Sequence, residues 1–113
     1  MTVPDALART RAETLAQIAA LTREFEEVVA ASRSSNADDE HDPEGATIAF
    51  ERQQVAALLD QARRRLADVD EALARAAAGD YGTCADCGRP IAPGRLEARP
   101  TARTCVACAS AAP

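Results

Sequence analysis

Residues 79–88, GDYGTCADCG, divide the chain into two parts with different sequence patterns. Gly79 ends a long run without Gly or Pro, and glycine readily adopts the left-handed conformation that terminates helices. Cys84 and Cys87 follow, spaced so that one tight turn can present both sulfur atoms to the same metal ion. Gly88 permits the backbone conformation that this turn needs. We therefore expect helices before residue 79 and a metal-bound module after it.

A second cysteine pair, Cys105 and Cys108, is separated from Cys87 by 17 residues, within the spacing of about 15 to 20 residues typical of four-cysteine zinc sites. Four thiolates complete a tetrahedron and leave no position for water, so we expect one Zn²⁺ ion with a structural role. The alternative is a redox-active pair or free thiols. A short segment poor in aliphatic residues cannot fold by burial alone, and zinc supplies about 10 to 16 kcal/mol in comparable sites.

Before the module, the sequence predicts two long helices. Apolar residues at three- and four-residue spacing mark a first stripe, interrupted by Arg11 and Thr14. Its members are Leu7, Leu15, Ile18, Leu21, Phe25 and Val28. The second helix is expected from about Pro43 to Ala78. Its stripe consists of Ile48, Arg52, Val55, Leu59, Ala62, Leu66, Val69, Leu73 and Ala76.

Helices with such stripes are not stable alone, so the two should fold back on each other as an antiparallel coiled coil. The predicted fold class is mainly α. We expect a helical hairpin over residues 1–79, followed by a small four-cysteine zinc ribbon of short strands and turns over residues 80–113. Nothing after Cys108 is long enough to add an element.

An acidic segment at about residues 34–46 forms the expected tip of the hairpin and includes Asp39. Asp42, Pro43 and Glu44 form a helix start: an N-cap, a first-turn proline and a carboxylate at the positive helix end. Two roles remain open for these carboxylates. They can contact a metal centre or basic loops of a partner, or they can serve only to cap the helix and solvate the loop.

Charge and composition exclude several functions. A net charge of −5 argues against general binding of duplex nucleic acid, which needs a basic surface. No stretch approaches the length of a membrane span, and no signal-peptide layout is present, so we expect a cytoplasmic protein. With two Phe, one Tyr and no Trp, an enzyme pocket is difficult to build, and we expect no enzyme.

Three stretches carry a resemblance to a known family: Gly79 to Gly88, the run RLEARPTA at residues 95–102, and the second cysteine pair. With the predicted hairpin before them, the chain resembles the DksA/TraR family of bacterial transcription regulators. The resemblance implies direct binding to RNA polymerase rather than sequence-specific binding to promoter DNA. It further implies that the hairpin enters the secondary channel and points its acidic tip toward the catalytic magnesium.

The resemblance also assigns roles to individual residues. Counted back from Cys84, the family's tip motif of two aspartates and an alanine falls on His41 beside Asp42, on Glu44 and on Ala46. Partner contacts are therefore expected at Asp42, Glu44, Ala46 and Asp39, and at Arg95 and Arg99 in the shared run. We expect a weak or absent response to the alarmone ppGpp. A basic position of relatives falls near Asp68 here, and the family's C-terminal helix is missing after Cys108.

Two other functions compete with transcription regulation. Arginines around the cysteines would suit a nucleic-acid-binding zinc ribbon, which predicts salt-sensitive binding. A coiled-coil assembly protein would instead pair its helices between chains. A closed hairpin should be monomeric, so light scattering distinguishes this last reading.

Overall fold

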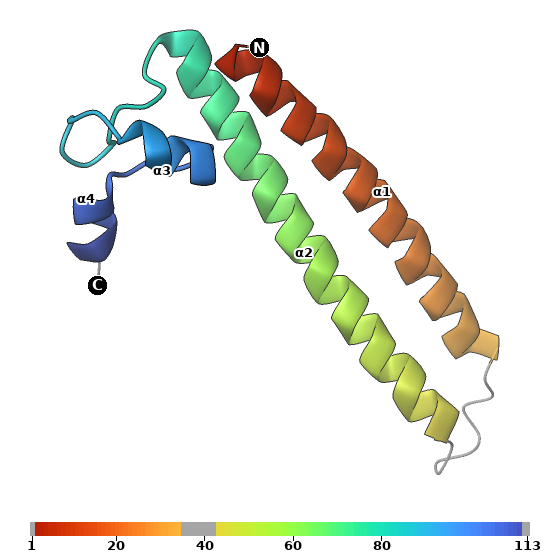
Figure 1. Ribbon diagram of the computed structural model, residues 1–113. Helices are drawn as coiled ribbons and strands as arrows, with labels where there is room; N and C mark the ends of the chain where they lie inside the picture. Colours follow the sequence, from red (N-terminus) through yellow and green to blue (C-terminus); the bar gives the residue numbers. More distant parts are fainter. Residues whose placement is uncertain (1, 35–42, 112–113) are drawn as a thin grey trace. The chain divides into compact units, whose positions relative to one another are not determined.

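The computed structural model describes residues 2–34 and 43–111. Two long helices, α1 (Val3–Ser34) and α2 (Pro43–Ala78), are followed by two short ones, α3 (Pro93–Ala98) and α4 (Val106–Ala111) (Figure 1). The described part contains no β-strand. The predicted fold class is confirmed: the chain is mainly helical, and α1 and α2 form a long helical hairpin. No described helix is both long and apolar enough to cross a membrane.

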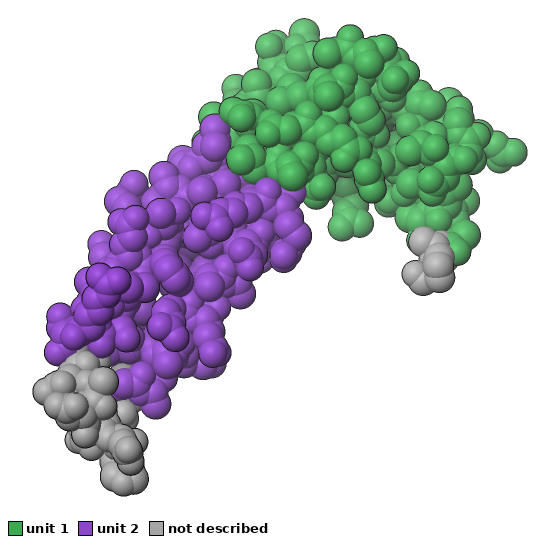
Figure 2. Space-filling view, turned by 180° about the vertical axis from the view of Figure 1, so that it is seen from behind, with its two compact units in different colours: residues 1–12, 66–113 green, residues 13–65 purple. Residues whose placement is uncertain are grey.

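The chain divides into two compact units, drawn in different colours in Figure 2. Unit 1 combines Met1–Ala12 with Leu66–Pro113, and unit 2 is Glu13–Arg65. Each unit therefore contains a segment of α1 and a segment of α2. The division into a hairpin over residues 1–79 and a module over residues 80–113 stays a prediction.

In unit 2, the two helices are joined by an aliphatic core. Leu21 of α1 packs with Val55, Leu59 and Ala62 of α2, and the half-buried Ile18 and Phe25 lie against this cluster. All of these residues belong to the two stripes read from the sequence. Because these contacts join α1 to α2 of one chain, this part of each apolar stripe is covered within the hairpin.

One member of the first stripe was placed wrongly. Leu15 is 40% exposed, whereas the neighbouring Thr14 is buried. Leu7, Thr14 and Leu21 are spaced by seven residues, and this strict heptad puts Leu15 beside the seam rather than on it. In unit 1, Arg11 continues the seam at its edge, where its Nε donates to Oδ1 of Asp70 at 2.6 Å.

The adjacent residues Leu58 and Leu59 allow a direct test of this core. Leu59 is 7% exposed and Leu58 is 44% exposed. We expect Leu59→Ala to lower the free energy of unfolding by about 2 to 5 kcal/mol, because it removes buried methyl groups and leaves a cavity. The matched control Leu58→Ala should change it by about 0.5 kcal/mol or less. Urea unfolding followed by circular dichroism measures both, and equal losses would contradict the assigned seam.

Both long helices have well-defined ends in unit 1. At the start of α1, the Thr2 N–H donates to the Asp5 carboxylate at 3.3 Å, and the Asp5 N–H donates to the Thr2 hydroxyl at 3.1 Å. This reciprocal pair is a capping box. At the end of α2, the N–H of Asp80 donates to the carbonyl of Arg75 at 2.8 Å and Gly79 has φ +85°. These features form a Schellman motif, which confirms Gly79 as the helix stop.

The module after Gly79 differs in detail from the expected ribbon. In place of short strands, its described residues have one isolated bridge, between Thr83 and Pro90, and the two helices α3 and α4. The prediction that no element follows Cys108 was also wrong, since α4 contains this cysteine and continues to Ala111. Neither helix has a buried residue, so neither produces a periodic apolar signal in the sequence.

Candidate metal centre

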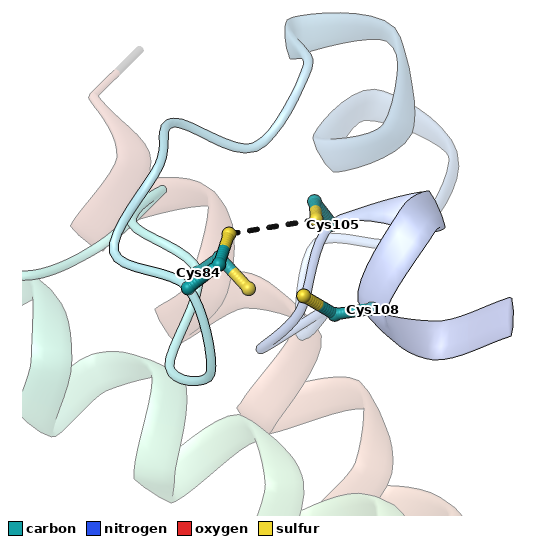
Figure 3. A group of neighbouring side chains, drawn as sticks. Cys84, Cys105 and Cys108 are labelled. Carbon is teal, nitrogen blue, oxygen red and sulfur yellow. Dashed lines mark hydrogen bonds between the residues drawn. The ribbon is translucent and has the colours of Figure 1, made fainter. Parts of the chain in front are cut away.

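The four cysteines come together in unit 1. The sulfur atoms of Cys84, Cys87, Cys105 and Cys108 all lie within 4.8 Å of one another. Figure 3 shows the side chains of Cys84, Cys105 and Cys108 turned toward one another. The sulfur atoms of Cys87 and Cys105 are 3.8 Å apart, and a tetrahedron with Zn–S bonds of about 2.3 Å has edges of about 3.8 Å. Donor type and spacing therefore both fit a four-thiolate zinc ion.

The first cysteine pair is presented by a tight turn closed by backbone hydrogen bonds. The N–H of Cys84 donates to the carbonyl of Arg89 at 2.8 Å, and the N–H of Gly88 donates to the carbonyl of Cys84 at 3.0 Å. Gly88 has φ +73°, a conformation that side-chain-bearing residues rarely adopt. This confirms the sequence interpretation of the turn, in which Gly88 allows the chain to reverse directly after Cys87.

The second pair is positioned by the start of α4 and by hydrogen bonds from other parts of the module. The N–H of Ala109 donates to the carbonyl of Cys105 at 2.9 Å. Nε of Arg95 donates to the carbonyl of Thr104 at 2.8 Å, directly before Cys105. The N–H of Ala85 donates to the carbonyl of Arg103 at 2.8 Å and so links the two cysteine turns. The second turn is thus held both from α3 and from the first turn.

The protein environment shifts the pKa values of Cys84 and Cys108 in opposite directions. Hydrogen bonds from backbone N–H groups, that of Cys105 first and that of Cys87 next, lower the pKa of Cys84 to about 6. Hydrogen bonding with the thiols of Cys105, Cys84 and Cys87 raises the pKa of Cys108 to about 12. Four thiols this close cannot all ionise together without a cation among them. Zn²⁺ held by the four cysteines would supply that positive charge and replace the remaining protons.

Three residues that the sequence did not single out hold the module in place. The hydroxyl of Tyr81 donates to the carbonyl of Pro100 at 2.8 Å. The guanidinium of Arg75, in the last turn of α2, approaches the carbonyls of Thr101 and Ala102 at 3.5 and 3.4 Å. Ile91 is 3% exposed and, with Cys84, is one of two buried residues among the described part of the module. The scarcity of aliphatic residues between the cysteine pairs could have identified Ile91.

The predicted partner-binding residues are only partly visible. Asp39 and Asp42 lie outside the described residues. Glu44 belongs to the first turn of α2, but its side chain is not described, and Ala46 is exposed on the same helix. Of the two arginines, Arg99 is exposed, whereas Arg95 is half-buried and engaged with Thr104. Their roles as partner contacts stay predictions.

Comparison with known proteins supports the interpretation of both the module and the hairpin. Residues 79–113 match the sequence model of the prokaryotic dksA/traR C4-type zinc finger. Two curated relatives, each described as "RNA polymerase-binding transcription factor DksA" and from two strains of Caulobacter vibrioides, are 49% identical over 43 residues. Those matches span 38% of this chain and 30% of each relative's length.

A solved structure, that of transcription factor DksA2 from Pseudomonas aeruginosa, extends the similarity to the hairpin. It has 33% sequence identity and a TM-score of 0.81, covering 96% of this chain and 78% of that one. The fold and the site therefore define a helical-hairpin protein with a four-cysteine zinc finger. The chain belongs to the DksA/TraR family.

Proposed function

We propose that this protein regulates transcription initiation by binding RNA polymerase directly. The hairpin enters the secondary channel of the enzyme, and the acidic segment between α1 and α2 lies near the catalytic centre. The observation that carries this proposal is the similarity to DksA2 over nearly the whole chain, hairpin and zinc finger together. The curated relatives are named as RNA polymerase-binding factors, which supports the same partner.

The hairpin has the dimensions that such a role needs. At 1.5 Å per residue, the 36 residues of α2 extend over about 50 Å. The segment that joins α1 to α2 supplies Asp39 and Asp42, and Glu44 follows in the first turn of α2. Carboxylates between two paired helices can approach a metal ion or basic loops inside a channel that a globular protein cannot enter.

An exposed aromatic residue adds a second kind of contact near this end of α2. Phe50 is 67% exposed, although large apolar side chains are rarely left in water without a reason. Ala46 is also exposed and lies four residues earlier, which places both on one face of the helix. We assign Phe50 and Ala46 to a hydrophobic contact with the polymerase, beside the carboxylates. The sequence could have identified Phe50 as exposed, because this residue lies outside the apolar stripe of α2.

The two competing functions receive less support. Arg103 is paired with Glu71 at 3.1 Å, and Arg95 donates to a backbone carbonyl, so both are engaged within unit 1 rather than free to bind phosphates. Pairing of α1 with α2 of the same chain in unit 2 gives no reason for assembly through these stripes. We expect a monomer by light scattering.

Capture of core RNA polymerase tests the proposal. Tagged, zinc-loaded protein is mixed with purified core polymerase, and we expect retention at physiological salt that survives nuclease treatment. Resin that carries no tagged protein reports nonspecific retention of the polymerase. Absence of capture, or capture that nuclease abolishes, would contradict direct binding to the enzyme.

The weak response to ppGpp remains part of the proposal. Asp68 is exposed on α2 and lies close enough to Arg103 to raise the pKa of its guanidinium, after the larger effect of Glu71. Glu71 and Asp68 thus offset the positive charge of Arg103 at this surface, which weakens its attraction for a nucleotide phosphate. Strong potentiation by ppGpp in a purified transcription assay would reverse the expectation.

A further inference from the structure

Unit 1 contains a groove that has no role in zinc binding or in the pairing of α1 with α2. It has a volume of about 380 Å³ and a mostly apolar lining. Its walls come from three separate segments: Ala6 and Leu7 of α1, Tyr81 after α2, and Pro93, Leu96 and Glu97 of α3. We propose that this groove binds a small organic cation, in which an apolar body carries one ammonium or guanidinium group. The proposal is independent of polymerase binding.

The walls of the groove are held in place without a ligand. The capping box of Thr2 and Asp5 fixes the first turn of α1. The hydrogen bond from Tyr81 to Pro100 fixes the turn after α2, and α3 begins at Pro93, whose ring restricts the backbone. Small-molecule sites have volumes of about 300 to 1,000 Å³ and are largely preformed, apolar concavities with few polar groups. This groove has those properties.

One charged group defines the kind of ligand. Among the residues that line the groove, Glu97 is the only carboxylate. It forms no ion pair or hydrogen bond with any described residue. Tyr81 adds no negative charge, because burial raises the pKa of its hydroxyl. Glu97 is exposed, so it can pair with the charged end of a ligand whose apolar body occupies the groove. The lining therefore complements a ligand that is apolar at one end and positively charged at the other.

A set of three probes of similar size tests this selectivity. The zinc-loaded chain, labelled with ¹⁵N, is titrated with 2-phenylethylamine, 2-phenylethanol and 3-phenylpropionate. We expect the amine to shift the amide signals around Ala6 and Leu96 with a dissociation constant on the order of 1 mM. The neutral alcohol should bind about two- to five-fold more weakly, the range of an exposed ion pair, and the carboxylate weaker still.

Two substitutions with matched controls locate the site. Ala6→Phe fills the groove and should abolish the shifts, whereas Ala8→Phe places the same ring on an exposed residue of α1 outside the lining and should not. Glu97→Gln should reduce binding of the amine to the level of the alcohol. Its control, Glu51→Gln, removes an exposed carboxylate from unit 2 and should leave binding unchanged. Zinc content and circular dichroism confirm that each variant is folded.

Three results would overturn the proposal. The first is equal affinity for the three probes, which would show that Glu97 does not select charge. The second is amine binding that survives Ala6→Phe in the folded variant or, should that variant fail to fold, amine binding that Glu97→Gln leaves at full strength. The third is a set of groove signals that shift with protein concentration alone, because a second copy of the chain would then occupy the groove.

Discussion

Removal of zinc should unfold the C-terminal module and leave most of the helical signal of α1 and α2 intact. The module has almost no core of its own, since Cys84 and Ile91 are its only buried residues in the described part of the chain. The metal, at about 10 to 16 kcal/mol in comparable sites, is therefore the main source of its stability. In unit 2, the hairpin has an aliphatic core that contains no cysteine.

Tyr81 provides the readout for this experiment. It is the only tyrosine in a chain that has no tryptophan. Its hydroxyl donates a hydrogen bond to the carbonyl of Pro100 within the module. Chelation should change tyrosine fluorescence while most of the circular dichroism at 222 nm is retained. Elemental analysis before chelation should give about one zinc ion per chain, as the single four-cysteine site requires.

Substitution of one ligand should have the same effect as chelation. Cys108→Ser replaces a thiolate with a hydroxyl that is a poor zinc ligand, so we expect loss of bound zinc and the same change in fluorescence. Ala107→Ser introduces the same hydroxyl at the neighbouring exposed position of α4 and should retain the metal. Full zinc content in Cys108→Ser, or an unaltered tyrosine signal after chelation, would refute the four-thiolate site.

Neutralising the carboxylates at the start of α2 should abolish regulation without abolishing binding. In the double variant Asp42→Asn, Glu44→Gln, we expect affinity for core polymerase within a few-fold of the unmodified protein and loss of the effect on transcription initiation. The reason is that a short carboxylate segment contributes little contact area, whereas its charge acts on the catalytic centre. Binding and transcription are measured separately on the same preparations.

These substitutions also separate the regulatory role from a purely structural one. Asn caps helices about as well as Asp, and loss of the Glu44 charge near the helix start costs about 0.3 to 1 kcal/mol. The melting temperature should therefore change little. The control variant Glu51→Gln, Asp60→Asn removes two exposed carboxylates from the body of α2 and should keep full activity. Unchanged regulation by the Asp42, Glu44 variant would leave these residues only a capping role.

The sequence was sufficient for the features that depend on spacing along the chain. The seven-residue period predicted both long helices and their pairing, Gly79 predicted the end of α2, and the cysteine spacing predicted the metal site. Leu15 was misplaced because a stripe read by three- and four-residue steps does not distinguish a seam position from its neighbour. In the structure, the buried residue is the polar Thr14.

The features that the sequence did not predict depend on contacts between distant segments. The helices α3 and α4 have six residues each and bury none, so they leave no period to recognise. The hydrogen bond from Arg95 to Thr104 assigns a structural task to a residue expected to contact a partner. The groove beside Glu97 exists only because the start of α1 meets α3, and no local pattern encodes that meeting.

Because unit 1 is formed by two segments that are distant in sequence, it constrains the order in which the chain folds during translation. The amino-terminal segment, up to Ala12, forms one compact unit with the residues from Leu66 onward. The helical segments 13–34 and 43–65 can pair as soon as they emerge, whereas the amino-terminal turns can pack only after the chain from Leu66 onward has been translated. In nascent chains halted at Arg65, residues 2–12 should therefore be cleaved by protease more readily than the paired segments.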